Sequence, residues 1–429
     1  MRVAIIGAGV AGLSALKRCI ENKDSPTASN KITDVVCYEK NNEAGGIWVY
    51  TDETGIDKYG LPVHSSMYKN LRTNLPKEVM SYPGFKNDID PNQSYVTRSA
   101  ILDYLDSYCK QFNLHQYIKF LHNVEMIEPT VDEDKKKWLI KVKDLVNGVE
   151  KVEYFDAVMV CNGHYFEPSI PVIKGQEKFQ GQQVHSHDYR VPEAYEGKKV
   201  VVMGAGRSGI DIAVEIASKA SQVFLSHHNV KLINTIFPDN IIQVPDIVEI
   251  NETEIIFSNG QRENVDVICW CTGYKYAFPF LSDKCGVKVD DNMVTPLWKH
   301  MISIENPTLA IIGVPFYVCA FNMCDLQVRF VLKYWLGDKQ FPAKDIMISE
   351  EADELERKKN EGLSKRHFHR MGLAQSNYYD DLAKVAGVEQ LPPVLGKMHA
   401  DSGKRFLEDL SNYRQDRYQV VDDFNFIKL

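Results

Sequence analysis

Two glycine-rich segments of the same design limit the fold of this chain more than any other feature of its sequence. Each has the pattern Gly-x-Gly-x-x-Gly, follows a short apolar run typical of a buried strand, and precedes a helical stretch. Their glycines are Gly7, Gly9 and Gly12 in the first segment and Gly204, Gly206 and Gly209 in the second. In such a unit the first glycine makes a tight turn, the second lets the backbone approach a pyrophosphate, and the third lets helix and strand pack closely. The sequence therefore predicts an α/β chain with two Rossmann-like, three-layer dinucleotide-binding domains.

An acidic residue follows the first unit where a dinucleotide ribose would lie. The apolar run of residues 34–38 ends at Glu39, and a carboxylate at that position takes the ribose hydroxyls. Glu39 lies further from Gly12 than is usual, and the polar stretch of residues 21–30 explains the distance as a lengthened loop. We therefore predict that the first unit binds a dinucleotide; an ordinary strand–helix turn is the alternative.

The second unit ends without an acidic residue. Its following strand, residues 222–225, leads into Ser226, His227 and His228. Because no carboxylate would repel a 2′-phosphate there, this unit is predicted to prefer NADPH to NADH. The alternative is that the two histidines are ordinary surface residues. Two dinucleotides on one chain indicate hydride transfer from a nicotinamide to a flavin.

Two similar segments mark where each nucleotide domain closes. Residues 156–163 and 266–273 both read as an aspartate, an apolar strand, a small polar residue and a glycine. We therefore expect an NADPH-binding domain at residues 167–276, inserted into an FAD-binding domain made of residues 1–166 and 277–429. The part of the chain after Asp325 reads as mostly helical.

Composition excludes several other classes of protein. The chain has 429 residues and a net charge of -8, so nucleic acid is not expected as a partner. Its nine cysteines include no Cys-x-x-Cys pair, which speaks against a disulfide framework and against a metal site. No apolar run is long enough to span a membrane, so no membrane anchor is expected. We expect a soluble protein of the cytoplasm; secretion is the alternative if a presequence has been removed.

The segment before the second glycine unit resembles a family signature. Phe179, Gly181, His185 and Tyr189 are similar to the FxGxxxHxxxY/F signature of flavin-containing monooxygenases. Baeyer–Villiger monooxygenases carry a related motif that ends in tryptophan. Three more segments are similar to motifs of the same family: residues 45–48, residues 73–78, and residues 271–281. The resemblance runs from residue 1 to about residue 340, and no motif is recognised beyond it.

The resemblance implies a set of cofactor-binding residues. Those implied for FAD are Gly7, Ala8, Gly9, Val10, Ala11, Gly12, Glu39, Gly46, Ile47, Trp48, Thr73, Asn74, Leu75 and Val124, with Gln327 near the flavin. Those implied for NADPH are Gly204, Gly206, Arg207, Ser208, Gly209, Asp211, Ser226, His227 and His228. The family often has an arginine after the second unit to hold the 2′-phosphate. Here the two histidines stand in that place, and Arg207 is the candidate to compensate.

Asn74 is the predicted catalytic residue. The resemblance puts it beside the flavin ring and the nicotinamide, where its amide would hydrogen-bond the oxygenating species and delay the loss of peroxide. The alternative is that Asn74 only caps a turn. For His185 a structural hydrogen-bonding role and a chemical role both stay open.

The resemblance also implies a reaction. NADPH reduces FAD, oxygen adds to give a flavin C4a-hydroperoxide, and this species oxygenates a nucleophilic nitrogen or sulfur of a small molecule. Residues 71–80 are similar to soluble insect members of the family that N-oxygenate pyrrolizidine alkaloids, so a tertiary-amine alkaloid is the expected substrate and detoxification the expected role. The alternatives are an N-hydroxylating monooxygenase of an amino-acid amine and a non-catalytic protein that senses FAD or NADPH. Assembly into a homo-oligomer stays open.

Overall fold

The computed structural model describes residues 1–23, 31–130, 137–229 and 231–429. Most of the lengthened loop predicted at residues 21–30 falls on residues 24–30 and so lies outside the described residues. The helices are α1 (Val10–Lys23), α2 (Arg98–Gln111), α3 (Arg207–Ala217), α4 (Ala320–Trp335), α5 (Lys344–Asn360), α6 (Gln375–Ala386) and α7 (Val394–Glu408). Within the described residues, no helix has both the length and the apolar character that crossing a membrane requires.

A seven-stranded sheet organises the first nucleotide-binding region. In spatial order its strands are β20 (Leu297–Trp298), β21 (Ile302–Ser303), β22 (Leu309–Ile311), β7 (Ala157–Val160), β1 (Arg2–Ile6), β2 (Asp34–Tyr38) and β3 (Ile118–Lys119). Strand β1 lies between β7 and β2 and pairs in parallel with both, as a βαβ unit requires. The near-continuous burial of β1, β2 and β7 explains why they read as apolar runs.

This sheet is the middle of three layers. Helix α1 and the long buried helix α4 pack together over one face. An antiparallel sheet covers the other face, and its Trp138 and Ile140 share an apolar core with Ala4 and Ile6 of β1. The strands of this second sheet are β4 (His122–Pro129), β5 (Trp138–Asp144) and β6 (Glu150–Phe155). The predicted three-layer α/β fold is confirmed.

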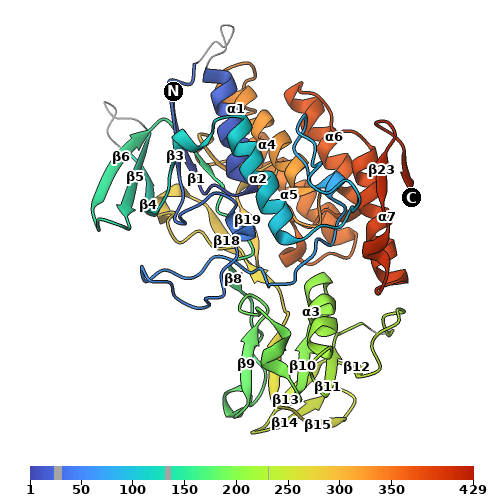
Figure 1. Ribbon diagram of the computed structural model, residues 1–429. Coiled ribbons are helices and arrows are strands. Elements are labelled where there is room, and N and C mark those ends of the chain that lie inside the picture. Colours follow the sequence, from blue (N-terminus) through green and yellow to red (C-terminus); the bar gives the residue numbers. More distant parts are fainter. Residues whose placement is uncertain (24–30, 131–136, 230) are drawn as a thin grey trace.

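A second, smaller unit repeats the same plan. Its parallel sheet has the order β12 (Ile241–Val244), β11 (Gln222–Ser226), β10 (Lys199–Met203), β16 (Val267–Trp270) and β9 (Gln182–His185). Helix α3 packs on one face, and a small antiparallel sheet shares a core with the other. The strands of that sheet are β13 (Ile247–Ile250), β14 (Glu254–Phe257) and β15 (Arg262–Asn264). Figure 1 shows this unit below the rest of the molecule.

The chain crosses between the two units along a pair of short strands. Strands β8 (Glu167–Pro168) and β17 (Tyr274–Lys275) pair antiparallel, so the outgoing and returning segments lie side by side. We propose a domain boundary at this pair, which agrees with an inserted domain of residues 167–276.

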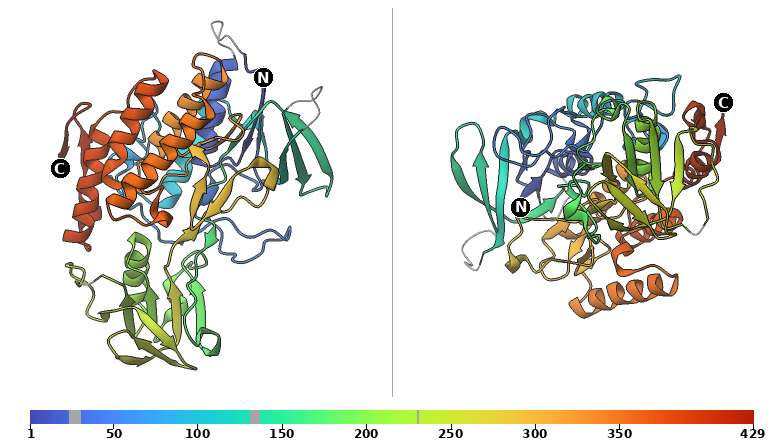
Figure 2. Two further views of the ribbon diagram at one scale, coloured as in Figure 1. Left: turned by 180° about the vertical axis from the view of Figure 1, so that it is seen from behind. Right: turned by 90° about the horizontal axis from the view of Figure 1, so that it is seen from below.

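The C-terminal part is helical and returns to the junction of the two units. Helices α4 to α7 stack beside the first sheet, and Figure 2 shows α7 and the C-terminal hairpin at the outer edge. That hairpin pairs β23 (Tyr418–Val420) with β24 (Phe426–Lys428). A further hairpin, β18 (Lys288–Asp290) with β19 (Met293–Thr295), follows the second crossing. The tail of the chain therefore lies near residues from its first quarter.

Candidate functional site

The first glycine loop has no room for a Cβ atom at Gly7 or Gly12. Gly7 has a φ of +99°, and a Cβ there would lie 2.7 Å from the Cys161 carbonyl oxygen. A Cβ on Gly12 would lie 1.8 Å from the Gly7 carbonyl oxygen, because α1 starts directly against the turn. The first N–H groups of α1 have no partner within the helix and are available to an anion such as a pyrophosphate. The loop therefore fits the FAD pyrophosphate that the sequence predicted.

A second glycine segment packs against the middle of this loop. A Cβ on Gly9 would lie 3.3 Å from the Gly46 Cα atom, and the Gly45 N–H donates to the Ala8 carbonyl oxygen at 2.9 Å. Gly45 and Gly46 both have positive φ, and Gly46 opens the short 3₁₀ helix that carries Ile47 and Trp48. The two segments thus come together as a backbone-lined cradle beside half-buried Ile47 and Trp48.

Glu39 lies at the end of β2, beside the same loop. Its carboxylate is buried and accepts hydrogen bonds from the backbone N–H groups of Ala8 at 2.7 Å and Asn41 at 2.8 Å. Burial raises the pKa of Glu39, and these two hydrogen bonds oppose that shift. The first glycine loop thus ends beside a buried carboxylate, the group that binds ribose hydroxyls in dinucleotide-binding βαβ units.

Two of the residues assigned to FAD lie deeper than the loop. Gln327 of α4 is fully buried; its Oε1 accepts from the Gly313 N–H at 2.8 Å, and its Nε2 donates to the Tyr378 hydroxyl at 2.8 Å. Val124 lies on β4 in the core behind the sheet. Gln327 therefore touches the cradle through Gly313, where a Cβ would be 3.9 Å from the Ala11 Cβ atom.

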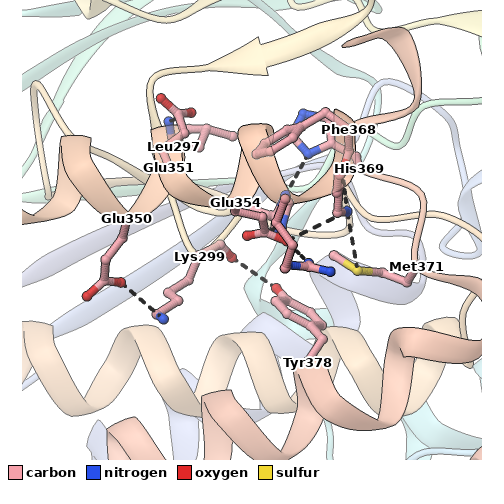
Figure 3. Close-up of polar contacts among 12 residues, drawn as sticks. Leu297, Lys299, Glu350, Glu351, Glu354, Phe368, His369, Met371 and Tyr378 are labelled. Carbon is pink, nitrogen blue, oxygen red and sulfur yellow. Dashed lines mark hydrogen bonds and ion pairs between the residues drawn. The ribbon is translucent and has the colours of Figure 1, made fainter. Parts of the chain in front are cut away.

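A polar network holds the Gln327 side chain from behind. The Tyr378 hydroxyl donates to the Lys299 carbonyl oxygen at 2.9 Å, and the Lys299 ammonium pairs with Glu350 at 3.1 Å. Figure 3 shows Tyr378 pointing at Lys299, with Glu350, Glu351 and Glu354 along the neighbouring helix α5. The network fixes the rotamer of Gln327 and so the position of Gly313.

The Asn74 loop is anchored at its start and open at Asn74. Buried Thr73 forms a pair of hydrogen bonds with Val96, at 2.8 Å through its N–H and at 3.1 Å through its hydroxyl oxygen. Asn74 is exposed, and its side-chain amide makes no hydrogen bond to any residue that the structure describes. Its carbonyl oxygen accepts from Arg207 Nη1 at 2.8 Å. The amide therefore caps no turn here and is free to meet a ligand.

The second glycine loop repeats the strict spacing of the first. Gly204 has a φ of +104°, and a Cβ there would lie 2.4 Å from the Cys271 carbonyl oxygen. A Cβ on Gly209 would lie 1.9 Å from the Gly204 carbonyl oxygen. By contrast, a Cβ on Gly206 would meet nothing within 4 Å. No side chain caps the start of α3 at Gly206, so its N–H groups too are open to a pyrophosphate.

The three residues predicted to surround the 2′-phosphate point in different directions. Buried Ser226 donates its hydroxyl to the Pro245 carbonyl oxygen at 2.9 Å. Buried His227 places its Nε2 atom 3.0 Å from Gln243 Oε1, and only His228 is exposed. His227 is thus held by the neighbouring strand β12 and Ser226 by the residue that follows it, so of the three only His228 lies open to a phosphate.

Arg207 and Asp211 reach the other side of the second loop. Arg207 donates to Asn74, as described above, and its guanidinium carbon lies 5.3 Å from the centre of the Phe406 ring. Asp211 forms an ion pair with Arg414 at 2.7 Å and accepts from the Tyr68 hydroxyl. These two predicted NADPH residues therefore line the junction with the C-terminal part. The sequence patterns did not point to Arg414, because it lies where no motif is recognised.

The signature segment supports the junction rather than the chemistry. A Cβ on Gly181 would lie 2.5 Å from the Phe179 ring and 2.4 Å from the Asp266 carbonyl oxygen, so this position needs glycine. The His187 N–H donates to His185 Nδ1 at 3.0 Å, which leaves the proton on Nε2 to bond the Gly273 carbonyl oxygen at 3.0 Å. Burial lowers the pKa of His185 to about 4, so its ring is neutral. These contacts favour the structural role for His185.

Aromatic rings gather beyond the carboxyl ends of β7 and β16, one strand from each of the two nucleotide-binding sheets. Tyr165 follows β7 and Tyr274 follows β16, with ring centres 5.5 Å apart, and the rings of His64 and Phe166 stack at 5.6 Å. Burial lowers the pKa of His64 to about 3, and burial lowers the pKa of neighbouring His164 to about 4, so both rings are uncharged. Tyr165 is 42% exposed, which leaves this aromatic cluster open on one side. No sequence pattern indicated it, since its members come from three separate segments.

Comparison with known proteins gives a consistent result. The flavin-binding monooxygenase-like family matches residues 1–239 and 228–401. Senecionine N-oxygenase of Tyria jacobaeae is 31% identical over all of this chain and 91% of its own length. Flavin-containing monooxygenase FMO GS-OX-like 1 of Arabidopsis thaliana is 35% identical over 98% of this chain and 94% of its own. The solved S-allyl-L-cysteine S-oxygenase of Allium sativum matches with a TM-score of 0.88 at 32% identity, over 96% of this chain and 94% of the other.

Proposed function

Because the chain belongs to the flavin-binding monooxygenase-like family, we propose that it transfers oxygen to the nitrogen or sulfur of a small, uncharged nucleophile. The chain is an FAD- and NADPH-dependent monooxygenase. One observation carries the proposal for the site: Arg207, in the second glycine loop, donates to the carbonyl of Asn74 at 2.8 Å. This contact ties the backbone of Asn74 to the second nucleotide loop.

We assign the two loops to the two cofactors by the residues that follow them. Glu39, buried against Ala8, suits the ribose of FAD at the first loop. No acidic residue follows β11, and exposed His228 at its end leaves room for the 2′-phosphate of NADPH at the second loop. FAD reduced by NADPH supplies the activation of oxygen, and the protein supplies binding and orientation.

Asn74 would act as a fixed hydrogen-bond donor. Its backbone is held on one side by the hydrogen bonds between Thr73 and Val96 and on the other by Arg207, so the point from which the exposed amide extends is fixed. A donor that is already oriented stabilises developing charge without a reorganisation cost. A soft nucleophile needs no general base to attack an electrophilic oxygen. In this proposal Asn74 is the group of the protein that acts on the oxygenating species, and no general base is required.

The aromatic cluster would bind the substrate. It lies at the carboxyl ends of β7 and β16, where α/β sheets bind their ligands. With His64 and His164 neutral, the cluster suits an uncharged amine or sulfide better than a zwitterionic amino acid. The named relatives include an N-oxygenase and an S-oxygenase. We place a tertiary-amine alkaloid first and a thioether second.

A substrate panel tests the proposal. The panel contains a pyrrolizidine-type tertiary amine, a dialkyl sulfide, and amino acids with a side-chain primary amine. NADPH consumption and product mass are followed together. We expect the amine and the sulfide each to gain one oxygen atom, and the amino acids to give none. Oxygenation of the amino-acid amine alone would show that the chain is the N-hydroxylating type of monooxygenase instead.

A further inference from the structure

Three successive backbone carbonyl groups of the Asn74 loop accept hydrogen bonds from two arginines. Arg414 Nη2 donates to the Arg72 oxygen at 3.3 Å, and Arg414 Nε donates to the Thr73 oxygen at 3.2 Å. Arg207 Nη1 donates to the next carbonyl, that of Asn74, at 2.8 Å. The loop in turn contacts the C-terminal segment, since Arg72 Nη2 donates to the Arg414 carbonyl oxygen at 3.3 Å.

The two arginines come from different parts of the chain and are joined by one aspartate. Arg207 is the first residue of α3, and Asp211 lies four residues later on the same face of that helix. Asp211 pairs with Arg414, which lies in the C-terminal 3₁₀ helix Tyr413–Gln415. The side chains of Arg414 and Asp211 are only 20% and 17% exposed. Although burial works against the charge of Arg414, the Asp211 carboxylate raises its pKa above the ordinary value.

We propose that Arg207 and Arg414 are positioning residues that form a clamp on residues 72–74, and that through it the C-terminal segment orients Asn74. The proposal rests on the role of Asn74 given above. A guanidinium group suits this task because its planar fork reaches two carbonyl oxygens at once, which a lysine ammonium does not do. The Asp211 pair also ties α3, and with it the second glycine loop, to the same backbone. The position of the Asn74 amide thus depends on both nucleotide-binding units.

Amide hydrogen exchange of residues 70–78 tests the clamp without reference to activity. In Arg414→Gln we expect exchange in this segment to be roughly tenfold to a hundredfold faster, because two charge-assisted hydrogen bonds and an ion pair are lost. Arg414→Lys keeps a cation for Asp211 but lacks the planar guanidinium that reaches two carbonyl oxygens. We therefore expect exchange in residues 70–78 to be faster than in the parent, as in Arg414→Gln, while the fold is preserved. The matched control is Arg2→Gln. Arg2 is 23% exposed, pairs with Asp34, and also donates to a backbone carbonyl, but it lies away from this loop.

A double-mutant cycle tests whether the clamp acts through Asn74. Product formed per NADPH consumed is measured for the parent, Arg414→Lys, Asn74→Ala and the double variant. We expect Arg414→Lys to lower this ratio in the parent and to leave it unchanged once Asn74 is alanine. Equal losses in both backgrounds would overturn the proposal, as would exchange in residues 70–78 no faster than in Arg2→Gln. If Asn74→Ala alone keeps the parent's ratio, the proposed role of Asn74 is wrong, and the exchange measurement still decides the clamp.

Discussion

The two glycine loops are alike at their first and third glycines and differ at the middle one. We call the tight contacts of the first and third glycines the steric frame of the loop. In both, the first glycine lies under a cysteine carbonyl, Cys161 or Cys271, and the third glycine lies against the carbonyl of the first. A Cβ on Gly9, the middle glycine of the first loop, would lie against Gly46, whereas a Cβ on Gly206 in the second loop would have no neighbour within 4 Å. The first loop is thus closed by its own domain. The second is left open, and its nearest support comes from Asn74 and the C-terminal part across the junction.

The shared frame predicts the largest effects. Gly12→Ala and Gly209→Ala each force a Cβ atom within 2 Å of a backbone oxygen, at 1.8 Å and 1.9 Å. No side chain can move to relieve these contacts, so we expect each variant to lose about 3 kcal/mol or more of unfolding free energy. Thermal and denaturant unfolding measure this loss. A stable, fully yellow Gly12→Ala protein would contradict the equivalence of the two frames.

The middle glycines should separate the loops. Gly9→Val drives branched methyl groups into Gly46, so we expect protein that lacks FAD and is colourless. A Cβ on Gly206 would meet nothing within 4 Å and the residue has a φ of -71°, so we expect the FAD content and stability of Gly206→Val to match the parent within about 0.5 kcal/mol. Flavin absorbance and unfolding curves provide both readings. Equal loss of flavin in the two variants would remove the contrast drawn here.

Asn74 is tied to the second loop through Arg207, and we expect the loss of its amide to affect the use of oxygen rather than cofactor binding. We expect Asn74→Ala to bind FAD and to be reduced by NADPH like the parent. One oriented hydrogen bond is worth roughly 1–3 kcal/mol, so hydrogen peroxide should form about tenfold to a hundredfold faster relative to product. Peroxide and product are measured per NADPH consumed. A variant that stays coupled but unfolds more easily would show that Asn74 is structural.

The neutral histidine at the crossing predicts a loss of stability in acid. The pKa of His185 is lowered by burial to about 4, against roughly 6.5 in the unfolded chain. The unfolded state therefore binds more protons between these values, and the His185 contribution, full above pH 6.5, falls as pH drops toward 4 by up to about 1.4 kcal/mol per pH unit. His185→Asn should reduce this slope in urea unfolding from pH 7 to pH 5, and the part that remains comes from other buried histidines such as His64 and His164. An unchanged slope would exclude His185 as its source.

The smallest effect is expected from a substitution in the residues that follow β11. His228→Glu places an exposed acid two residues after the end of β11, next to buried His227, which is the counterpart of Glu39, and should disfavour the 2′-phosphate of NADPH. Because His228 is exposed, we expect a shift of about 1 kcal/mol, or roughly fivefold, in the ratio of kcat/KM for NADPH and NADH. The parent should prefer NADPH. Equal kcat/KM for both nucleotides in the parent would show that the second strand end does not discriminate.

The pattern of the sequence was sufficient for the architecture. The two glycine units, the apolar strands around them and the single acid Glu39 predicted the α/β fold with two Rossmann-like units, which the structure and the relatives confirm. Such predictions succeed because they depend on contacts within one βαβ unit. The steric need for Gly12, for example, is set by the Gly7 carbonyl oxygen in the same turn.

The sequence pattern could not predict in which direction the side chains at the ends of strands point. Ser226, His227 and His228 are consecutive and all polar, so the sequence treated them as one group. The partner strand β12 and the residues next to it cover the first two and leave only His228 open. Gln327 likewise reads as a polar helix residue, and only the packing of α4 against Tyr378 and Gly313 buries it completely.

What the sequence determined by itself is therefore the local frame: which residues must be glycine, where the strands run, and how many nucleotides the chain can hold. What the tertiary structure decided is the surroundings of Asn74. Its loop is held by Arg207 and by Arg414, which lies 340 positions further along the chain. Local patterns carry no information on that pairing, because it exists only once the C-terminal helices have packed back onto the junction of the two units.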